Sequence, residues 1–269
     1  MRDLSVDTAV WGRDGRYTAT LSAGWDIWGP QGGYVAAVAL RAAAAAASFP
    51  RPASFACHFL RPAQVGPIDI RVESLRETRR AQSLRVILVQ NDAAILEALV
   101  WTVAAIVGID HEAGGRPSVP QPDQVDPWEA YLPGGEVPFP FWRNFDVRPI
   151  TPPPREWSQA ADPQFVFWTR LRVANGLDDP FVDAARMLVA ADSAMYPAAT
   201  FAHEEPFPYI APSMDLAMTF HRTGTNSQWL LVEASSPLAE GALVAGRASI
   251  WSLRGGLLSS ATQQMLQRT

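Results

Sequence analysis

Residues 24–48 read GWDIWGPQGGYVAAVALRAAAAAAS, and this stretch decides the fold. Pro30, Gly32 and Gly33 mark the start of the predicted helix. The residues after them are mostly alanine, a composition that favours a helix. Two prolines shortly after the run prevent the helix from continuing. The sequence therefore predicts one long helix from about Gln31 to Ser48. Its small side chains would let another element pack closely against it.

The segments on either side of this helix have the composition of strands. Two short runs, Thr8–Trp11 and Arg16–Leu21, precede it. Four runs of β-branched or alternating residues follow it, separated by turn-forming or charged segments. The first part of the chain, residues 1–107, is thus predicted to be a helix enclosed by an antiparallel sheet.

Residues 108–163 have a different composition and hold 12 of the 23 prolines. Proline cannot donate to a sheet ladder or continue a helix interior, so this segment is predicted to be a connector. A disordered linker rarely contains many aromatic residues, so we expect the connector to pack across the surface. Its aromatic residues include Trp128, Phe139, Phe141, Trp142, Phe145 and Trp157.

The pattern of the first part then returns in residues 164–269. Gln164–Val173 has the composition of a strand, and Asp179 and Pro180 are typical of a helix start. The helix is predicted to end at about Tyr196, before a proline, and four further strand-like runs follow. CHFLRP at residues 57–62 corresponds to MTFHRT at residues 218–223.

The repeated order predicts an α+β fold, the double hot-dog. In this fold two antiparallel sheets, each wrapped around one long helix, are joined as a pseudo-dimer within one chain. The first unit would span residues 1–107 and the second residues 164–269, with the connector 108–163 between them.

Composition excludes several classes of protein. A net charge of −5 and a pI near 5.4 argue against a nucleic-acid surface. The single Cys57 excludes an intramolecular disulfide and a cysteine-based zinc site, and the four histidines lack ligand spacing, so no metal or other cofactor is expected. No signal peptide is evident and no apolar run is long enough for a membrane span, so we expect a cytoplasmic protein.

Four motifs resemble those of a known family. WDIWGPQGGY at Trp25–Tyr34 is similar to the first-helix entrance of the thioesterase-like superfamily. FLRP at Phe59–Pro62, VESL at Val72–Leu75 and FHR at Phe220–Arg222 resemble strand signatures of acyl-CoA thioesterase II. The resemblance covers about three quarters of the chain and omits the connector. It implies an acyl-CoA substrate, a homo-oligomer, and thioester hydrolysis by water without metal or covalent nucleophile.

The same resemblance implies three catalytic residues. They are Asp192 in VAADSAM, Ser213 in APSMDLAMTFHR, and Gln263 in SSATQQM. Serine stands where the family commonly has threonine, which keeps the hydroxyl. Because Gln264 adjoins Gln263, a slip by one residue remains open.

Elementary chemistry also singles out Asp192. On a helix, Leu188, Val189, Met195 and Tyr196 would flank it on one face, with Asp183 and Arg186 on the other side. A carboxylate in an apolar stripe is costly to bury, and burial would raise its pKa as suits a general base. The alternative is an aspartate satisfied by local backbone or by an arginine.

The other candidates are more ambiguous. Strict alternation places Ser213 on the face of Asp215 and Thr219, opposite the apolar face that should meet the helix. Gly32 and Gly33 could offer N–H groups to the thioester oxygen or could serve only close packing. Five arginines could meet coenzyme A phosphates or form a solvated hairpin: Arg71, Arg76, Arg79, Arg80 and Arg85.

Two competing functions stay open. A hot-dog hydratase or dehydratase would need a histidine beside its aspartate, and none occurs in the ten residues after Asp192. A non-catalytic acyl-CoA-binding protein would keep the same pocket. A G-x-S-x-G nucleophile motif and a Walker A motif are both absent.

Overall fold

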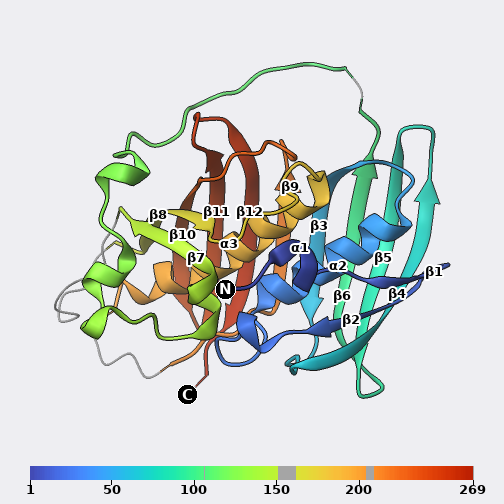
Figure 1. The fold of residues 1–269 in the computed structure, drawn as a ribbon, viewed down its shortest axis with the longest axis horizontal. Coiled ribbons are helices and arrows are strands. Elements are labelled where there is room, and N and C mark those ends of the chain that lie inside the picture. Colours follow the sequence, from blue (N-terminus) through green and yellow to red (C-terminus); the bar gives the residue numbers. More distant parts are fainter. Residues whose placement is uncertain (106, 151–161, 204–208, 269) are drawn as a thin grey trace.

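A computed structural model describes residues 1–105, 107–150, 162–203 and 209–268, and the strands within them form one antiparallel sheet of 12 strands (Figure 1). Six strands come from the first part of the chain, in the order β1 (Trp11–Arg13), β2 (Arg16–Leu21), β4 (Gly66–Glu77), β5 (Ala81–Gln90), β6 (Ala93–Val103) and β3 (Arg51–Phe59). The other six continue the sheet as β9 (Asp215–Phe220), β12 (Leu257–Leu266), β11 (Leu243–Ser252), β10 (Leu230–Glu240), β8 (Gln164–Leu171) and β7 (Phe145–Pro149).

The two halves of the sheet join where β3 pairs with β9. Ala56 lies opposite Ala217 in this antiparallel ladder. The expectation of an antiparallel sheet around each helix is thus corrected in one respect, because the two expected sheets are hydrogen-bonded into one. The chain offset of 161 that relates CHFLRP to MTFHRT also relates these two alanines, so the junction lies at the centre of the sequence repeat.

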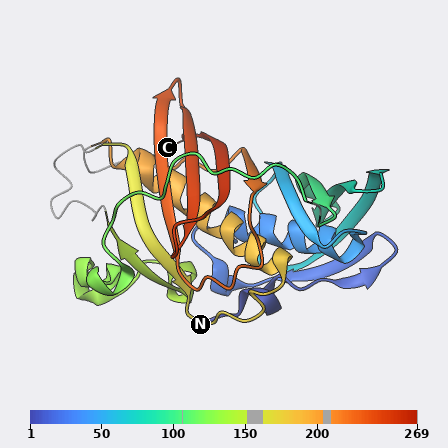
Figure 2. The same cartoon turned by 90° about the horizontal axis from the view of Figure 1, so that it is seen from above.

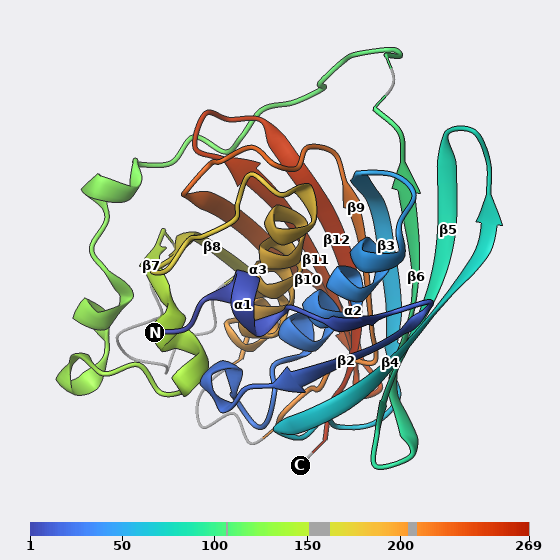
Figure 3. The ribbon, with the colours of Figure 1, turned by 45° about the vertical axis from the view of Figure 1, so that its right-hand side comes forward.

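Two long helices, α2 (Gly32–Ala46) and α3 (Pro180–Thr200), lie side by side on the concave face of the sheet (Figures 2 and 3). From Gly33 to Ala43 every residue of α2 except Arg41 is buried. Because alanine side chains are small, a second helix and the sheet can pack close to the α2 backbone.

The second helix is longer than its sequence indicates. Pro197 was expected to end it at Tyr196, but α3 continues to Thr200 with Pro197 inside. A proline fits helical φ, but it removes one backbone hydrogen bond and its ring crowds the carbonyl of the preceding turn. The last turn is closed by Phe201, whose N–H donates to the carbonyl of Pro197 over 3.2 Å.

The N-terminal prediction of a strand at Thr8–Trp11 is wrong. A short helix α1 (Leu4–Asp7) ends just before this segment, residues 8–10 are a turn and irregular chain, and the first strand begins only at Trp11. Asp3 caps the helix by accepting from the N–H of Ser5, and the Thr8 hydroxyl donates to the carbonyl of Leu4 over 2.6 Å. These local caps outweigh the β propensity of the segment.

The connector is more ordered than its proline content suggests. It contains four 3-10 helices, η2 (Pro122–Gln124), η3 (Trp128–Tyr131), η4 (Pro133–Gly135) and η5 (Pro140–Asn144), and the edge strand β7. A fifth 3-10 helix, η1 (Ala23–Trp25), lies against η5, where the rings of Trp25 and Phe141 meet edge to face at 6.2 Å. The expected packing of connector aromatics is confirmed for Phe141, Trp142 and Phe145, which are buried. Residues 151–161, including Trp157, lie outside the described residues.

None of the helices in the described ranges is both long and apolar enough to cross a bilayer.

Candidate active site

Asp192 lies in the middle of α3, and the residue is only 8% exposed. Both of its oxygens accept hydrogen bonds. Oδ1 accepts from the Ser213 hydroxyl over 2.9 Å and from the Gln263 side-chain amide. Oδ2 accepts from the Gly33 backbone over 2.7 Å and from the Gln31 side-chain amide. The three residues expected to act together therefore meet in space, with two partners from the start of α2.

Gln263 reaches Asp192 because its side chain faces inward on β12. It is 4% exposed, and its Nε2 also donates to Ser213 Oγ over 2.7 Å. The side chain of the neighbouring Gln264 points to the other face of the strand. The backbone N–H of Gln264 donates to Asp215 over 2.8 Å. The glutamine that contacts Asp192 is thus Gln263 and not Gln264.

Ser213 reaches Asp192 although alternation along the strand places it on the wrong face. Within β9 the alternation holds, with Leu216, Met218 and Phe220 buried. Ser213, however, precedes the strand, and the chain bends at Met214. The bend turns the Ser213 hydroxyl toward α3. The alternation of side chains between the two faces of β9 therefore does not extend to Ser213.

Gln31 is a site residue that the sequence analysis missed. It caps α2, and its Oε1 accepts from the N–H of Tyr34 over 2.8 Å. Because this cap uses the oxygen, the amide nitrogen of Gln31 is left to donate to Asp192. The available signal was a polar residue between Pro30 and Gly32 at a predicted helix start, a position where side chains often cap the backbone.

Gly33 is needed for the contact between the two helices. A Cβ at this position would lie 2.6 Å from the Leu188 carbonyl oxygen and 2.9 Å from Asp192 Cβ. At Gly32 the space is slightly larger, since a Cβ would lie 3.0 Å from Asp192 Oδ2. The close-packing role of both glycines is therefore evident. The N–H of Gly33 donates to Asp192 in this structure.

The environment of Asp192 favours the protonated, neutral form of its carboxyl group more than water would. Burial raises the pKa of Asp192 above its ordinary value, and the hydrogen bonds from Gly33, Ser213, Gln263 and Gln31 reduce that rise. Burial likewise raises the pKa of the Cys57 thiol well above its usual value, as expected of an inert, buried cysteine.

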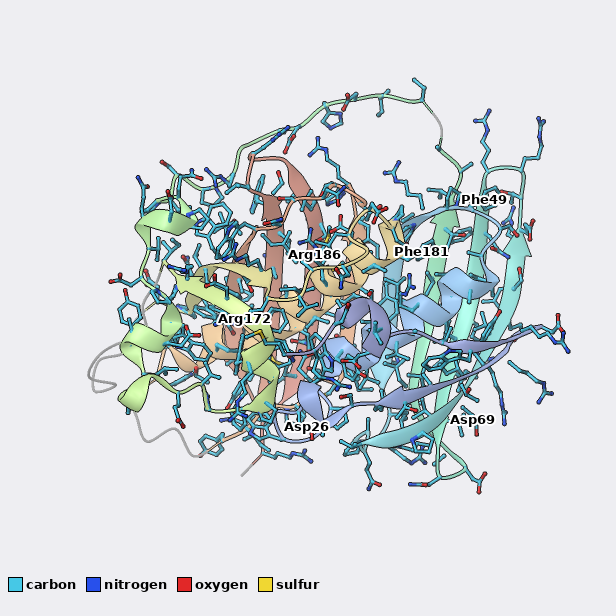
Figure 4. All side chains as sticks on the ribbon, viewed as in Figure 1. Asp26, Phe49, Asp69, Arg172, Phe181 and Arg186 are labelled. Atoms are coloured by element: carbon cyan, nitrogen blue, oxygen red, sulfur yellow. The ribbon has the colours of Figure 1, made fainter. Side chains whose placement is uncertain are left out.

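The charged pair on α3 lies apart from the site. Arg186 Nε donates to Asp183 Oδ1 over 2.7 Å, and both side chains are almost fully buried. Figure 4 shows Arg186 on the half of α3 that begins near Phe181. Asp192 is therefore satisfied by amide, hydroxyl and backbone donors, and the alternative of an arginine partner is not realised.

The arginine group lies on the β4–β5 hairpin. Arg71, Arg76, Arg79 and Arg80 are exposed, and Arg85 forms a 2.8 Å ion pair with Glu97. Two strands, β6 and β3, separate this hairpin from β9. No contact between these arginines and the Asp192 site is present in the described part of the chain, so the solvated hairpin is the simpler interpretation.

The described residues contain no cluster of three or more histidine, cysteine, aspartate or glutamate side chains suited to a metal. Within the same ranges no histidine donates to or accepts from Asp192, while His221 lies 3.1 Å from the Ser260 hydroxyl. The site therefore consists of a carboxylate surrounded by neutral donors.

Two family models match most of the chain. Residues 13–103 match the acyl-CoA thioesterase N-terminal domain, and residues 117–267 match the acyl-CoA thioesterase C-terminal domain. Mouse acyl-coenzyme A thioesterase 8 is 29% identical over 122 residues, which are 44% of this chain and 38% of the mouse protein. The match thus spans well under half of that relative.

Solved structures share the whole architecture. An acyl-CoA thioesterase II, TesB2, from Mycobacterium marinum is 24% identical with a TM-score of 0.80, covering 99% of this chain and 98% of its own. A protein with a hot-dog fold from Alicyclobacillus acidocaldarius is 19% identical with a TM-score of 0.85, covering 100% and 99%. A dehydratase domain from the CurJ module of curacin polyketide synthase is 10% identical with a TM-score of 0.56, covering 94% and 91%. At these identities the likeness establishes the hot-dog fold.

Proposed function

The chain belongs to the acyl-CoA thioesterase family, and we propose that it hydrolyses acyl-CoA thioesters through a water molecule activated by Asp192. The observation that carries this proposal is the convergence of Ser213 and Gln263 on one buried carboxylate. A general base must be positioned within hydrogen-bond reach of its proton donor and have a pKa near the working pH. Burial moves the pKa of Asp192 in that direction.

Gln263 would orient the attacking water. Its Nε2 is engaged by Asp192 and Ser213, whereas its buried Oε1 has no hydrogen-bond partner within the described residues. An unpaired buried acceptor is costly and is satisfied by a donor such as water. A water held by Gln263 Oε1 would lie next to the carboxylate that is to take its proton.

The reaction then proceeds in two steps. The water oxygen attacks the thioester carbonyl carbon while its proton passes to Asp192. The carbon–sulfur bond breaks next, and the proton on Asp192 passes to the departing thiolate, which yields a carboxylic acid and coenzyme A. The N–H of Gly32, the first residue of α2, has no intrahelical acceptor and would stabilise the developing oxyanion.

Replacement of the base tests the proposal. Asp192→Asn fills the same space but cannot accept the proton, so turnover should fall by roughly 10²–10⁴-fold while a non-hydrolysable acyl-CoA analogue still binds. Asp69→Asn removes a charge from an exposed position on β4 and serves as the matched control (Figure 4). Undiminished single-turnover hydrolysis in Asp192→Asn would remove Asp192 from the mechanism.

The non-catalytic alternative differs in one measurement. A protein that only binds acyl-CoA would bind the analogue but release no thiol from any acyl-CoA tested. A dehydratase would instead need an acid or base such as histidine at the site, and the described residues place no histidine against Asp192. The neutral donors around the carboxylate favour hydrolysis.

We also propose that the two halves are hot-dog units joined as a pseudo-dimer, with the connector between residues 108 and 163. The division of the sheet order at β3 and β9 supports this, as does the side-by-side position of α2 and α3. Further association into a homo-oligomer and a cytoplasmic location complete the proposal. Size-exclusion chromatography with light scattering tests the oligomer.

A further inference from the structure

A cavity of about 160 Å³ lies beside the C-terminal part of α3. Three small or apolar residues form its buried floor, namely Ala199, Ala211 and Val244. Tyr196 also lines it, and the polar residues His203, Glu240 and Gln267 are more exposed than the floor. The cavity therefore has an apolar base and a polar opening, which suits the end of a hydrocarbon chain rather than a charged group.

The cavity lies on the same face of α3 as Asp192. Tyr196 and Ala199 follow Asp192 by four and seven residues, a spacing that places them on successive turns of one helical face. Each turn advances about 5.4 Å, so the cavity begins roughly one turn beyond the carboxylate. Asp192 itself does not line this cavity.

The positions of residues on β11 also place the cavity close to Asp192. On β11, Val244 and Gly246 both face inward, and Gly246 lies opposite Gln263 in the ladder with β12. Val244 lies two residues from Gly246, a step of about 6.6 Å along a strand. Helix and sheet thus both place the cavity next to the contact between Asp192 and Gln263.

Met195 packs against β11 beside the contact between Asp192 and Gln263. It is fully buried, and a Cβ added to Gly246 would lie 2.8 Å from its Sδ, so the methionine rests on the backbone beside Gln263. Methionine is unbranched with three rotatable side-chain bonds and adapts to irregular spaces.

We propose that this cavity receives the distal methylene groups of the acyl chain and that Met195 is the side chain that admits them. The proposal rests on the proposed function in one respect, because it places the thioester at Asp192. A cavity of roughly 150 Å³ holds one benzene molecule, so this one takes about six carbon atoms. The substrate class is therefore a medium-chain acyl group, and the ends of longer chains would pass the polar opening into solvent.

Binding of S-alkyl coenzyme A thioethers of increasing chain length tests the proposal without requiring hydrolysis. Affinity should rise about fourfold per methylene, since each buried methylene contributes about 0.8 kcal/mol, and should level off once the cavity is filled. Ala199→Leu and Val244→Phe each reduce the cavity, so both should bring the plateau at a shorter chain. Met195→Ala should move the plateau to a longer chain. The shortest thioether should bind each variant as it binds the parent protein.

A matched control is available on the same strand. Leu243 adjoins Val244, points outward and is 44% exposed, so Leu243→Phe adds similar bulk outside the cavity and should leave the series unchanged. Thermal unfolding identifies any variant that fails to fold, and the two cavity-filling variants arise on different elements.

Three outcomes overturn the proposal. They are an unchanged series in a folded cavity-filling variant, an equal loss for every chain length including coenzyme A itself, and no binding of any thioether by the parent protein. The equal loss would place the coenzyme A moiety in the cavity. If the series responds as expected but acyl-CoA is not hydrolysed, the cavity assignment stands and the proposed function fails.

Discussion

The backbone nitrogen of Gly33 lies 2.7 Å from the carboxylate of Asp192 and donates to it across the contact between the two central helices. A main-chain group of one half of the chain thus helps to fix the proposed base of the other half. Only a glycine permits the two backbones to approach so closely at this position.

We therefore expect Gly33→Ala to lower both stability and activity. The new methyl group would meet the backbone of Leu188 and Val189, and overpacking of this kind typically costs about 1–3 kcal/mol. Chemical denaturation measures the first effect and the rate of thiol release the second. Gly115→Ala, where nothing lies within 4 Å of the added Cβ, is the control and should match the parent protein.

The activity should be lost on the acid side at a higher pH than for an ordinary aspartate. Hydrolysis needs the deprotonated carboxylate, and burial raises the pKa of Asp192 above its ordinary value. The rate therefore falls as the pH decreases through the raised pKa. The same group favours folding below its unfolded-state pKa, and this stabilisation is lost as the pH rises through the raised folded-state pKa. A profile of kcat/KM whose acid limb lies at the ordinary aspartate pKa would contradict the assignment.

Gln31→Met should move that acid limb further toward neutral pH. The substitution keeps the length of the side chain but removes a donor to Asp192 Oδ2, and this donor lowers the pKa of the carboxyl group. Gln264→Met makes the same change on the opposite face of β12 and should leave the limb in place. If the two variants share one pH profile, Gln31 has no role in setting the charge of Asp192.

Ser213→Ala should slow hydrolysis by about tenfold or more, because a hydrogen bond to a charged group contributes about 1.5–3 kcal/mol. Ser213→Thr keeps the hydroxyl and should retain most of the activity. Comparison of single-turnover rates for the two variants checks this. Equal losses would show that the packing around Ser213, rather than its hydroxyl, matters.

The buried ion pair on α3 should affect stability without being part of the site. Arg186→Leu leaves the Asp183 carboxylate buried without its cation, which typically costs about 3–5 kcal/mol. The double variant Asp183→Leu with Arg186→Leu removes both charges and should recover much of the loss. A double-mutant cycle in denaturant measures the coupling, and additive effects would disprove it.

The sequence predicted most of the fold and named four of the five site residues, missing only Gln31. Asp192 and Gln263 were found through motifs, and the apolar stripe around Asp192 indicated burial independently. The doubt over Ser213 came from extending strand alternation beyond the first residue of β9, where the chain bends. A bend of this kind depends on tertiary contacts, so local pattern does not reveal it.

The remaining two residues depend on how the helices meet. Gln31 has an ordinary local role as a helix cap, and only the packing of α2 on α3 gives its amide nitrogen a partner. Gly33 was found as a candidate, but its N–H was assigned to the substrate rather than to Asp192. The N-terminal helix was missed for a related reason, since the capping contacts of Asp3 and Thr8 outweighed the strand propensity.

The two halves of the chain share both the sheet, through the pairing of β3 with β9, and the site. We therefore expect that neither half acts alone. Gln31 and Gly33 come from one half, and Asp192, Ser213 and Gln263 from the other, so neither half holds a complete site. Joining them in one chain makes their encounter intramolecular, with an effective concentration that short linkers raise to about the millimolar range. Two separately expressed halves would instead have to find each other, and their activity would depend on dilution.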